Sequence, residues 1–152
     1  MPTVSIAVQP PQAAQAGQVL YPPVIAKMTT RSSHERHYYF SMAVLLDYNG
    51  TVIEGGLAGN AVSTGVLAGS HVVFVFPDLS IVTPGEYNIR LDVYKVAYED
   101  PSGATFSTQT ATRDISIAVS NGADHHARPS SAERAYICTL RDAGVAVPSR
   151  PS

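Results

Sequence analysis

Residues 71–96 read HVVFVFPDLSIVTPGEYNIRLDVYKV and contain two runs of strand-forming residues joined by a turn. In the first run, residues 71–76, Phe74 and Phe76 alternate with valines, so both faces of the strand are apolar. Such a run is typical of a strand that is covered on both sides. We therefore expect residues 71–76 to lie in the interior of the fold.

The second run, residues 87–96, alternates between apolar and polar side chains. This pattern predicts an antiparallel strand with one face in the core and the other in water. Between the two runs, Pro84-Gly85 occupies the central positions of a predicted type II turn. The predicted inward residues of the second strand are Tyr87, Ile89, Leu91 and Val93, and the predicted outward ones are Asn88, Arg90 and Asp92.

The composition predicts one mostly-β domain. Of 152 residues, 45% are apolar and only 14% are charged, which is a globular balance. Eight Tyr and four Phe favour strands, and eleven Gly with eleven Pro provide turns. We expect a single domain over residues 1–147 and a flexible tail over residues 148–152.

Further strands are expected at residues 4–8, 24–28, 38–46 and 113–119. Residues 9–23 are rich in Pro, Gln and Ala and predict an extended loop. Turns are expected at Asn49-Gly50, as a type I′ hairpin with a return strand over 51–54, and at the Asp-Pro-Ser-Gly within 98–107. Six to eight short strands at this spacing are typical of a β-sandwich.

Near the C-terminal end of the sequence, the spacing of the apolar residues changes from that of a strand to that of a helix, and one helix is expected there. Ser130 and Glu133 form a predicted capping box, and Gly144 stands where a helix C′ residue belongs. The expected buried stripe comprises Ala132, Tyr136, Thr139, Leu140 and Ala143, with Cys138 packed beside it.

The net charge of −2 is unevenly distributed along the chain. Residues 1–46 carry +2 and residues 127–152 carry +2, whereas nine acids against three cations leave residues 47–126 at −6. The two mildly basic ends permit an anionic partner but are too weakly charged to require one, and an ordinary solvated surface is the favoured interpretation.

The motifs needed for catalysis or metal binding are missing from the sequence. The glycines follow no phosphate-binding pattern, and no Gly-x-Ser-x-Gly elbow is present. His34 with His37 and the pair His125-His126 lack partners at metal-ligand spacing. We expect no catalytic residue, no metal, no cofactor and no small-molecule substrate, and therefore no enzyme.

The sequence also carries few features that indicate a cellular compartment. The single cysteine, Cys138, excludes an internal disulfide, and no apolar run reaches the length of a membrane span. No signal peptide is recognised at the start of the sequence. These observations predict an intracellular protein with no membrane association.

Several segments of the sequence, taken in order, resemble the fungal velvet domain. The most specific lies in the opening stretch, as FVFPDLSI followed by GEYNIRL. VQPPQAAQAG, YPPVI, YYFSMAVLLD, GLAGNAVS, ISIAV and SSAERAYICTLRDAGVAVPSR resemble further family segments, so the resemblance covers nearly the whole chain. The signature positions are Phe74, Phe76, Asp78, Leu79, Ser80, Gly85, Tyr87 and Arg90.

The resemblance implies an immunoglobulin-like β-sandwich, similar to Rel-homology domains, with a C-terminal helix. It also implies a regulator of fungal development, sporulation and secondary metabolism. Such proteins form homo- or heterodimers with other velvet proteins and bind promoter DNA in the nucleus, with a cytoplasmic pool possible.

One departure from the family concerns the DNA contacts. The family segment between Gln-Pro and Pro-Pro-Ile usually carries Lys and Arg, whereas here PQAAQAGQVLY contains none. Because cations supply most phosphate affinity, the candidates for double-stranded DNA binding become Lys27, Arg31, Arg36 and Arg150. The alternative hypothesis is a dimerisation partner of other velvet proteins with weak or no DNA binding of its own.

Overall fold

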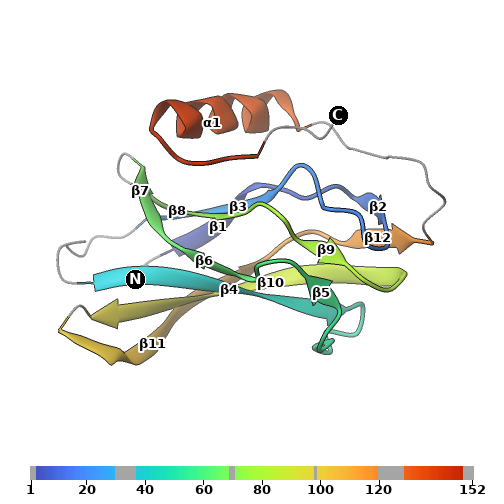
Figure 1. Ribbon diagram of the computed structural model, residues 1–152, viewed down its shortest axis with the longest axis horizontal. Coiled ribbons are helices and arrows are strands. Elements are labelled where there is room, and N and C mark those ends of the chain that lie inside the picture. The colour runs from blue at the N-terminus through green and yellow to red at the C-terminus, as the bar shows by residue number, and fades with distance from the viewer. Residues whose placement is uncertain (1–2, 30–36, 69–70, 98, 120–128, 149–152) are drawn as a thin grey trace.

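Two β-sheets face each other in the computed structural model, and a single helix covers the outer side of one of them (Figure 1). The structure describes residues 3–29, 37–68, 71–97, 99–119 and 129–148. Within these residues the protein is mostly β and has a β-sandwich-like arrangement of layers, as the sequence predicted.

The four-stranded sheet has the order β1-β3-β8-β7, and the six-stranded sheet has the order β2-β12-β10-β4-β6, with β11 also pairing with β10. A separate small sheet pairs β5 with β9. The strands are β1 Thr3–Val8, β2 Ala13–Gln15, β3 Val24–Thr29, β4 His37–Asp47, β5 Leu57–Ala58, β6 Val62–Thr64, β7 Val66–Ala68, β8 His71–Phe76, β9 Ser80–Ile81, β10 Gly85–Ala97, β11 Asp100–Ala111 and β12 Ile115–Ala118. The helix α1 spans Ser131–Asp142.

The opening stretch supplies an interior strand to each sheet. β8 lies between β3 and β7, whereas β10 lies between β12 and β4 in the other sheet. Phe74 and Phe76 are fully buried, and they share one apolar cluster with Ile89 and Leu91. The prediction that residues 71–76 are interior is therefore confirmed, as is the inward set of the second strand.

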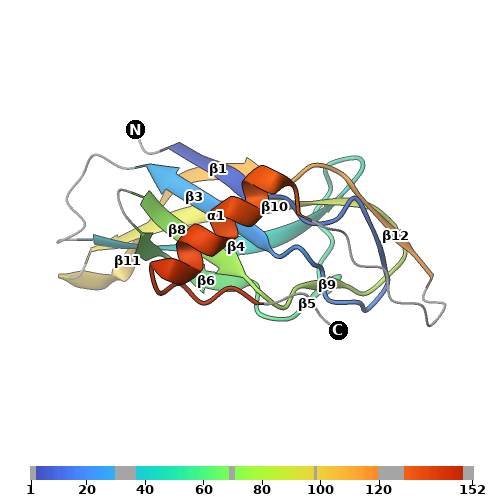
Figure 2. The ribbon, with the colours of Figure 1, turned by 90° about the horizontal axis from the view of Figure 1, so that it is seen from above.

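The valines on the other face of β8 are covered by the helix. Val73 packs with Ile25 of β3 and with Ile137 and Leu140 of α1 in a second apolar cluster. Figure 2 shows α1 crossing above β3 and β8. Both faces of β8 are apolar because one faces the other sheet and one faces the helix.

The helix begins with the predicted capping box of Ser130 and Glu133. Glu133 also joins the helix to the sheet, because its Oε2 accepts a hydrogen bond from the Gln9 backbone N–H at 2.7 Å. The predicted buried stripe was wrong in part. Ile137 and Leu140 are buried, whereas Cys138, Thr139, Ala132 and Ala143 are exposed, since the sheet meets the helix along a narrow line.

Three of the sequence-based turn predictions need correction. No non-glycine residue in the described chain has a positive φ, so Asn49-Gly50 is not a type I′ turn. Gly50 alone has φ +82°, and the Asp47 carboxylate accepts hydrogen bonds from the Asn49 and Thr51 backbone N–H groups. In place of the predicted return strand, only a single bridge joins Val52 to Leu46.

The Pro-Gly turn also differs from type II. Gly85 opens β10 with φ +151°, far from the roughly +80° of a type II turn. The Tyr87 ring lies against Gly85, and the Tyr87 hydroxyl donates to the Pro84 carbonyl at 3.2 Å. A side chain at position 85 would meet that ring, so this glycine is fixed by packing as well as by its backbone.

Other boundaries shifted as well. The turn expected within 98–107 falls before Asp100, which pairs with Ala97 and begins β11. The loop at 9–23 contains the short strand β2, which runs parallel to β12 at the edge of the sheet. The sequence alternation placed Val119 on one face with Ile115 and Ile117, but Val119 is 73% exposed because β12 ends at Ala118.

Replacing Phe76 with Ala should lower the free energy of unfolding by about 3–5 kcal/mol, because a large buried side chain would leave a cavity between the sheets. Urea denaturation followed by circular dichroism measures this. Tyr48→Ala is the matched control, since Tyr48 is 82% exposed and its loss should cost little. Equal destabilisation by the two variants would contradict the assigned core.

Ser41 of β4 and Ser63 of β6 are paired in register, and their hydroxyl groups differ in hydrogen bonding. The Ser41 hydroxyl is fully buried and has no hydrogen-bond partner within the described chain. The Ser63 hydroxyl accepts a hydrogen bond from the Val75 backbone N–H at 3.2 Å, which links β6 to the edge of the other sheet.

We therefore expect Ser41→Ala to raise the free energy of unfolding by about 1 kcal/mol, since an unsatisfied buried hydroxyl is removed. Ser63→Ala should lower it by about 1–2 kcal/mol, because the Val75 N–H loses its acceptor. Thermal and urea unfolding of the two variants, measured side by side, would contradict this interpretation if both changes had the same sign.

Candidate interaction surface

The apolar alternation in β4 faces out of the sandwich. Phe40, Met42 and Val44 lie on the outer side of the six-stranded sheet, whereas Ser41 and Ala43 face the interior and are buried. The sequence alternation places Tyr38, Phe40, Met42, Val44 and Leu46 on one face and Ser41 and Ala43 on the other, and this division is confirmed. The inward face of the strand adds Tyr39 and Leu45 to the core beside Phe74 and Phe76, so both faces of β4 carry large side chains.

Three aromatic rings form a row across the outer side of this sheet. Phe40 of β4 and Tyr94 of β10 stack with ring centroids 5.2 Å apart, and Phe106 of β11 meets Tyr94 edge-on at 5.9 Å. Phe106 is 52% exposed. The rings come from three adjacent strands whose register places them opposite one another, so the row is fixed by the pairing of the sheet.

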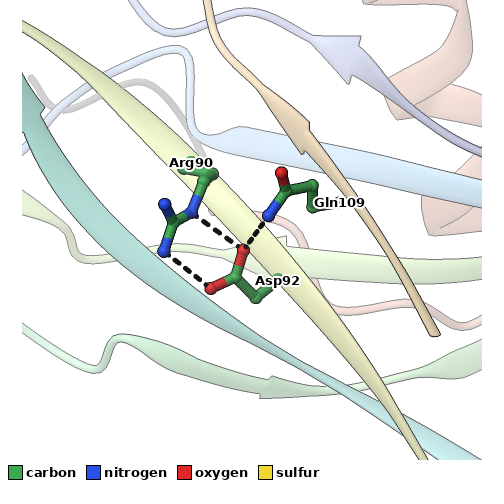
Figure 3. A network of polar contacts seen from close by, with 3 residues as sticks. All are labelled: Arg90, Asp92 and Gln109. Atoms are coloured by element: carbon green, nitrogen blue, oxygen red, sulfur yellow. Dashed lines mark hydrogen bonds and ion pairs between the residues drawn. The ribbon is translucent and has the colours of Figure 1, made fainter. Parts of the chain in front are cut away.

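A polar network lies beside the aromatic row. Asp92 accepts two hydrogen bonds from the Arg90 guanidinium, at 2.9 and 3.1 Å, and a third from the Gln109 side-chain amide at 3.0 Å (Figure 3). Asp92 was predicted to face water, but it is 7% exposed because Arg90 and Gln109 close over it. The two charges compensate each other, so the network brings no net charge to this side of the sheet.

Together these residues form what we call the outer sheet surface. Its apolar part comprises Phe40, Met42, Val44, Val62, Tyr94 and Phe106, and its polar part is the Arg90–Asp92–Gln109 network. Met42 and Val62 are 40% and 44% exposed. The helix covers the outer side of the other sheet, but within the described residues no element covers this one.

Of the four predicted DNA-binding residues, only Lys27 lies within the described chain. Its ammonium sits 5.4 Å from the centre of the Tyr136 ring, a cation–π contact between β3 and α1. Burial of the phenol, which disfavours its charged form, raises the pKa of Tyr136. Lys27 thus helps to hold the helix, and Arg31, Arg36 and Arg150 fall outside the described residues.

The remaining described cations lie on β10, on the segment before β12 and on α1. Arg90 is paired with Asp92, and Arg141 donates to the Pro148 carbonyl at 2.9 Å. Lys95, Arg113 and Arg134 belong to β10, the segment before β12 and α1, respectively. Two of these cations are thus engaged within the chain, and the other three come from three separate segments.

The velvet-like signature positions have structural roles. The Asp78 carboxylate accepts a hydrogen bond from the Asn60 backbone N–H at 3.0 Å, and a Cβ on neighbouring Gly59 would overlap the Asp78 carbonyl. Leu79 and Ser80 are buried next to the segment that follows β2, since the Leu20 N–H donates to the Leu79 carbonyl. Asp78 thus joins the turn after β8 to the segment after β5.

Other chemistry finds little support in the described chain. Its His, Cys, Asp and Glu side chains form no group of three suited to a metal ion. Cys138 was predicted to be packed but is exposed, because it lies on the side of α1 that faces away from the sheet. No helix in the described ranges is long and apolar enough to span a membrane.

The outer sheet surface was not recognised in the sequence. The alternation in residues 38–46 showed that one face of this strand is apolar, but it did not show which way that face points. The position of Phe106 in a Thr-rich strand was a second signal. Its meaning depends on the register with Tyr94, which only the structure gives.

Comparisons with known proteins gave few matches. No protein-family model matches the chain, and no curated protein matches it. Among solved structures, the chain is similar to AggA, the major subunit of aggregative adherence fimbriae type I from Escherichia coli. The two proteins are 17% identical, the match covers 79% of this chain and 96% of the AggA chain, and the TM-score is 0.36. The CooA pilin subunit of enterotoxigenic Escherichia coli follows with 11% identity, coverages of 70% and 88%, and a TM-score of 0.23. Both TM-scores are below 0.5, so they carry no conclusion about function.

Proposed function

We propose that this protein is a velvet-type regulator of fungal development and secondary metabolism, and that it acts by associating with velvet-type proteins. The family resemblance of the sequence supports the family role. The uncovered outer sheet surface supports association as the mode of action. In this proposal the β-sandwich is of the immunoglobulin-like, Rel-homology type, and the protein works in the nucleus with a cytoplasmic pool.

The energetics of the surface favour a protein partner. Aromatic and arginine side chains dominate binding energy at protein interfaces, particularly where they are surrounded by groups that exclude water. Here Phe40, Tyr94 and Phe106 hold one another in place, so little side-chain entropy is lost when a partner covers them. Arg90 and Asp92 already satisfy each other, which lowers the cost of removing them from water.

Replacing Phe106 with Asp should abolish co-purification with velvet-type partners, because a carboxylate would be buried without a counter-charge. Co-expression with tagged velvet proteins, followed by affinity capture, measures this. Tyr48→Asp serves as the control, since Tyr48 is highly exposed in a distant turn. Wild-type protein that captures no velvet partner, or capture that survives Phe106→Asp, would contradict the proposal.

Promoter-DNA binding is a second candidate function. It is favoured by the position of Arg31 and Arg36, which follow the end of β3 in a chain segment directly after Lys27. A double-stranded DNA complex held by phosphate contacts weakens steeply with salt.

If this second function holds, the double variant Arg31→Ala with Arg36→Ala should lose about two phosphate contacts. The dependence of the logarithm of the binding constant on the logarithm of the salt concentration should become correspondingly less steep. Fluorescence anisotropy with promoter-like duplexes at several salt concentrations measures the slope. Arg113→Ala with Arg134→Ala is the matched control of equal charge. Binding that is absent in the wild type, or equally reduced in both double variants, would count against DNA recognition by these arginines.

A further inference from the structure

The strands β11 and β12 follow one another along the same side of β10. The far side of β12 is covered by β2, which runs parallel to it and accepts a hydrogen bond from the Ser116 N–H at the Gln12 carbonyl, at 2.8 Å. β11 pairs with β10, and no other strand of the described chain pairs with it. Among the described strands, half of this sheet edge is therefore covered by β2, and the half formed by β11 is not.

The pairing with β10 shows which backbone groups of β11 point away from the sheet. The Thr112 N–H donates to the Ile89 carbonyl, so Ile89 and every second residue after it in β10 direct their backbone groups toward β11. Their register partners in β11 are Thr105, Thr108 and Thr110. The residues that direct their N–H and C=O groups outward, on either side of the bulge at Ser107, are Ala104, Phe106, Gln109 and Ala111. We call these outward groups the free edge of β11.

The free edge has few of the features that usually protect a sheet edge from pairing. Residues 102–112 contain neither a charged residue nor a proline, and β11 is 12 residues long. The side chains from Gly103 to Phe106 are exposed. Apart from two irregularities in the register with β10, this strand carries no device of the kind that blunts an edge. Its threonines also favour the extended conformation that pairing requires.

We propose that the free edge of β11 binds an extended, uncharged segment of a partner protein. The segment would add a strand to the six-stranded sheet beside β11, in the position that β2 takes beside β12. In this mode of recognition the main-chain hydrogen bonds supply affinity, and alternate side chains supply selectivity. The inference goes beyond the proposed function, because backbone groups at the edge of the sheet make the contacts, and the outer sheet surface is not required.

The chemistry of the edge selects this kind of partner over others. A helix has its own backbone groups paired internally, so it cannot satisfy the outward N–H and C=O groups of β11. A nucleic acid would need cations, and residues 102–112 supply none. An extended chain offers donors and acceptors at the spacing of the free edge, and the uncharged strand Ala13–Gln15 already occupies the adjacent half in this way.

The surroundings of β11 also predict the side chains of the partner segment. On the outer face, a side chain of the added strand would lie beside the Phe106 ring, where β-branched residues pack well. On the inner face, the added strand would approach β1, which lies near β11 in the other sheet, so small side chains fit there. We therefore expect a segment in which threonine or valine alternates with alanine.

Amide hydrogen exchange, measured by NMR on the full chain, tests the added strand residue by residue. The probe is a capped peptide of sequence Thr-Ala-Val-Ala-Thr-Ala-Val. In the free protein, the outward amides should exchange faster than those of Thr105, Thr108 and Thr110. Saturating peptide should slow the outward amides at least about tenfold, because they become hydrogen-bonded. The outward amides are those of Ala104, Phe106, Gln109 and Ala111.

The strand β12 provides the internal control, since its amides are already paired on both sides and should not respond to the peptide. Outward amides that are slow before the peptide is added would show that the edge is already covered, and would overturn the proposal. Peptide that does not bind, or that slows all β11 amides alike, would overturn it as well.

A double variant with Ala104→Pro and Ala111→Pro removes two outward N–H groups and leaves the pairing with β10 intact. We expect it to bind the labelled peptide at least about tenfold more weakly in fluorescence anisotropy, because two hydrogen bonds are lost and the proline rings block the approach. Ala104→Val with Ala111→Val is the matched control, since it keeps both N–H groups and should bind as the wild type does.

Methylated peptides test the same pairing on the wild-type protein, in case the proline variants do not fold. One peptide carries N-methyl groups on its threonines and valines, and the other carries them on its alanines. Only one of these two sets of N–H groups can face β11, so one peptide should lose binding and the other should keep it. Equal binding by both would exclude backbone pairing and overturn the proposal.

The failure of this inference is distinguishable from that of the proposed function. The double proline variant retains Phe106 and should still co-purify with velvet-type proteins while it fails to bind the peptide. Peptide binding by a protein that captures no velvet-type partner supports the free edge and contradicts the proposed function. Capture of a velvet-type partner by a protein that does not bind the peptide does the reverse.

Discussion

The apolar contact between the inward faces of β8 and β10 is the constraint on which the other features depend. Phe74 and Phe76 fill the space between the sheets together with Ile89 and Leu91, and this fixes the direction of every other side chain in both strands. One face of β8 must then meet the helix, and one face of β10 must point outward. A shift of one residue in either strand would exchange core and surface.

This constraint leaves each sheet with an outer face, and the two outer faces differ in what covers them. On the four-stranded sheet, α1 buries Val73 and Ile25, and Lys27 and Glu133 hold it by a cation–π contact and a hydrogen bond. On the six-stranded sheet, polar groups of β10 satisfy one another while the aromatic row stays accessible. An intramolecular cover and a neutral, partly apolar surface are two ways of meeting the same requirement to limit contact between apolar groups and water.

The sequence predicted the strands best where burial alone determines the pattern. Residues 71–76 and 87–93 were assigned correctly because alternation reports burial on each face. Prediction failed where the outcome depends on distant partners. The turn at Asn49-Gly50 is set by the Asp47 carboxylate, and the exposure of Val119 by the end of β12. The outer sheet surface could not be located because alternation shows that one face of β4 is apolar and does not show which way that face points.

The position of the helix in the chain has a consequence for biosynthesis. The strands that α1 covers, β1, β3 and β8, are made from residues 3–76, whereas the covering residues Ile137, Leu140 and Val145 are made later. During translation at about 5–20 residues per second, the apolar face formed by Val8, Ile25 and Val73 stays uncovered for several seconds. In a nascent chain with this order of elements, that apolar face is open to contact with other molecules until the helix emerges.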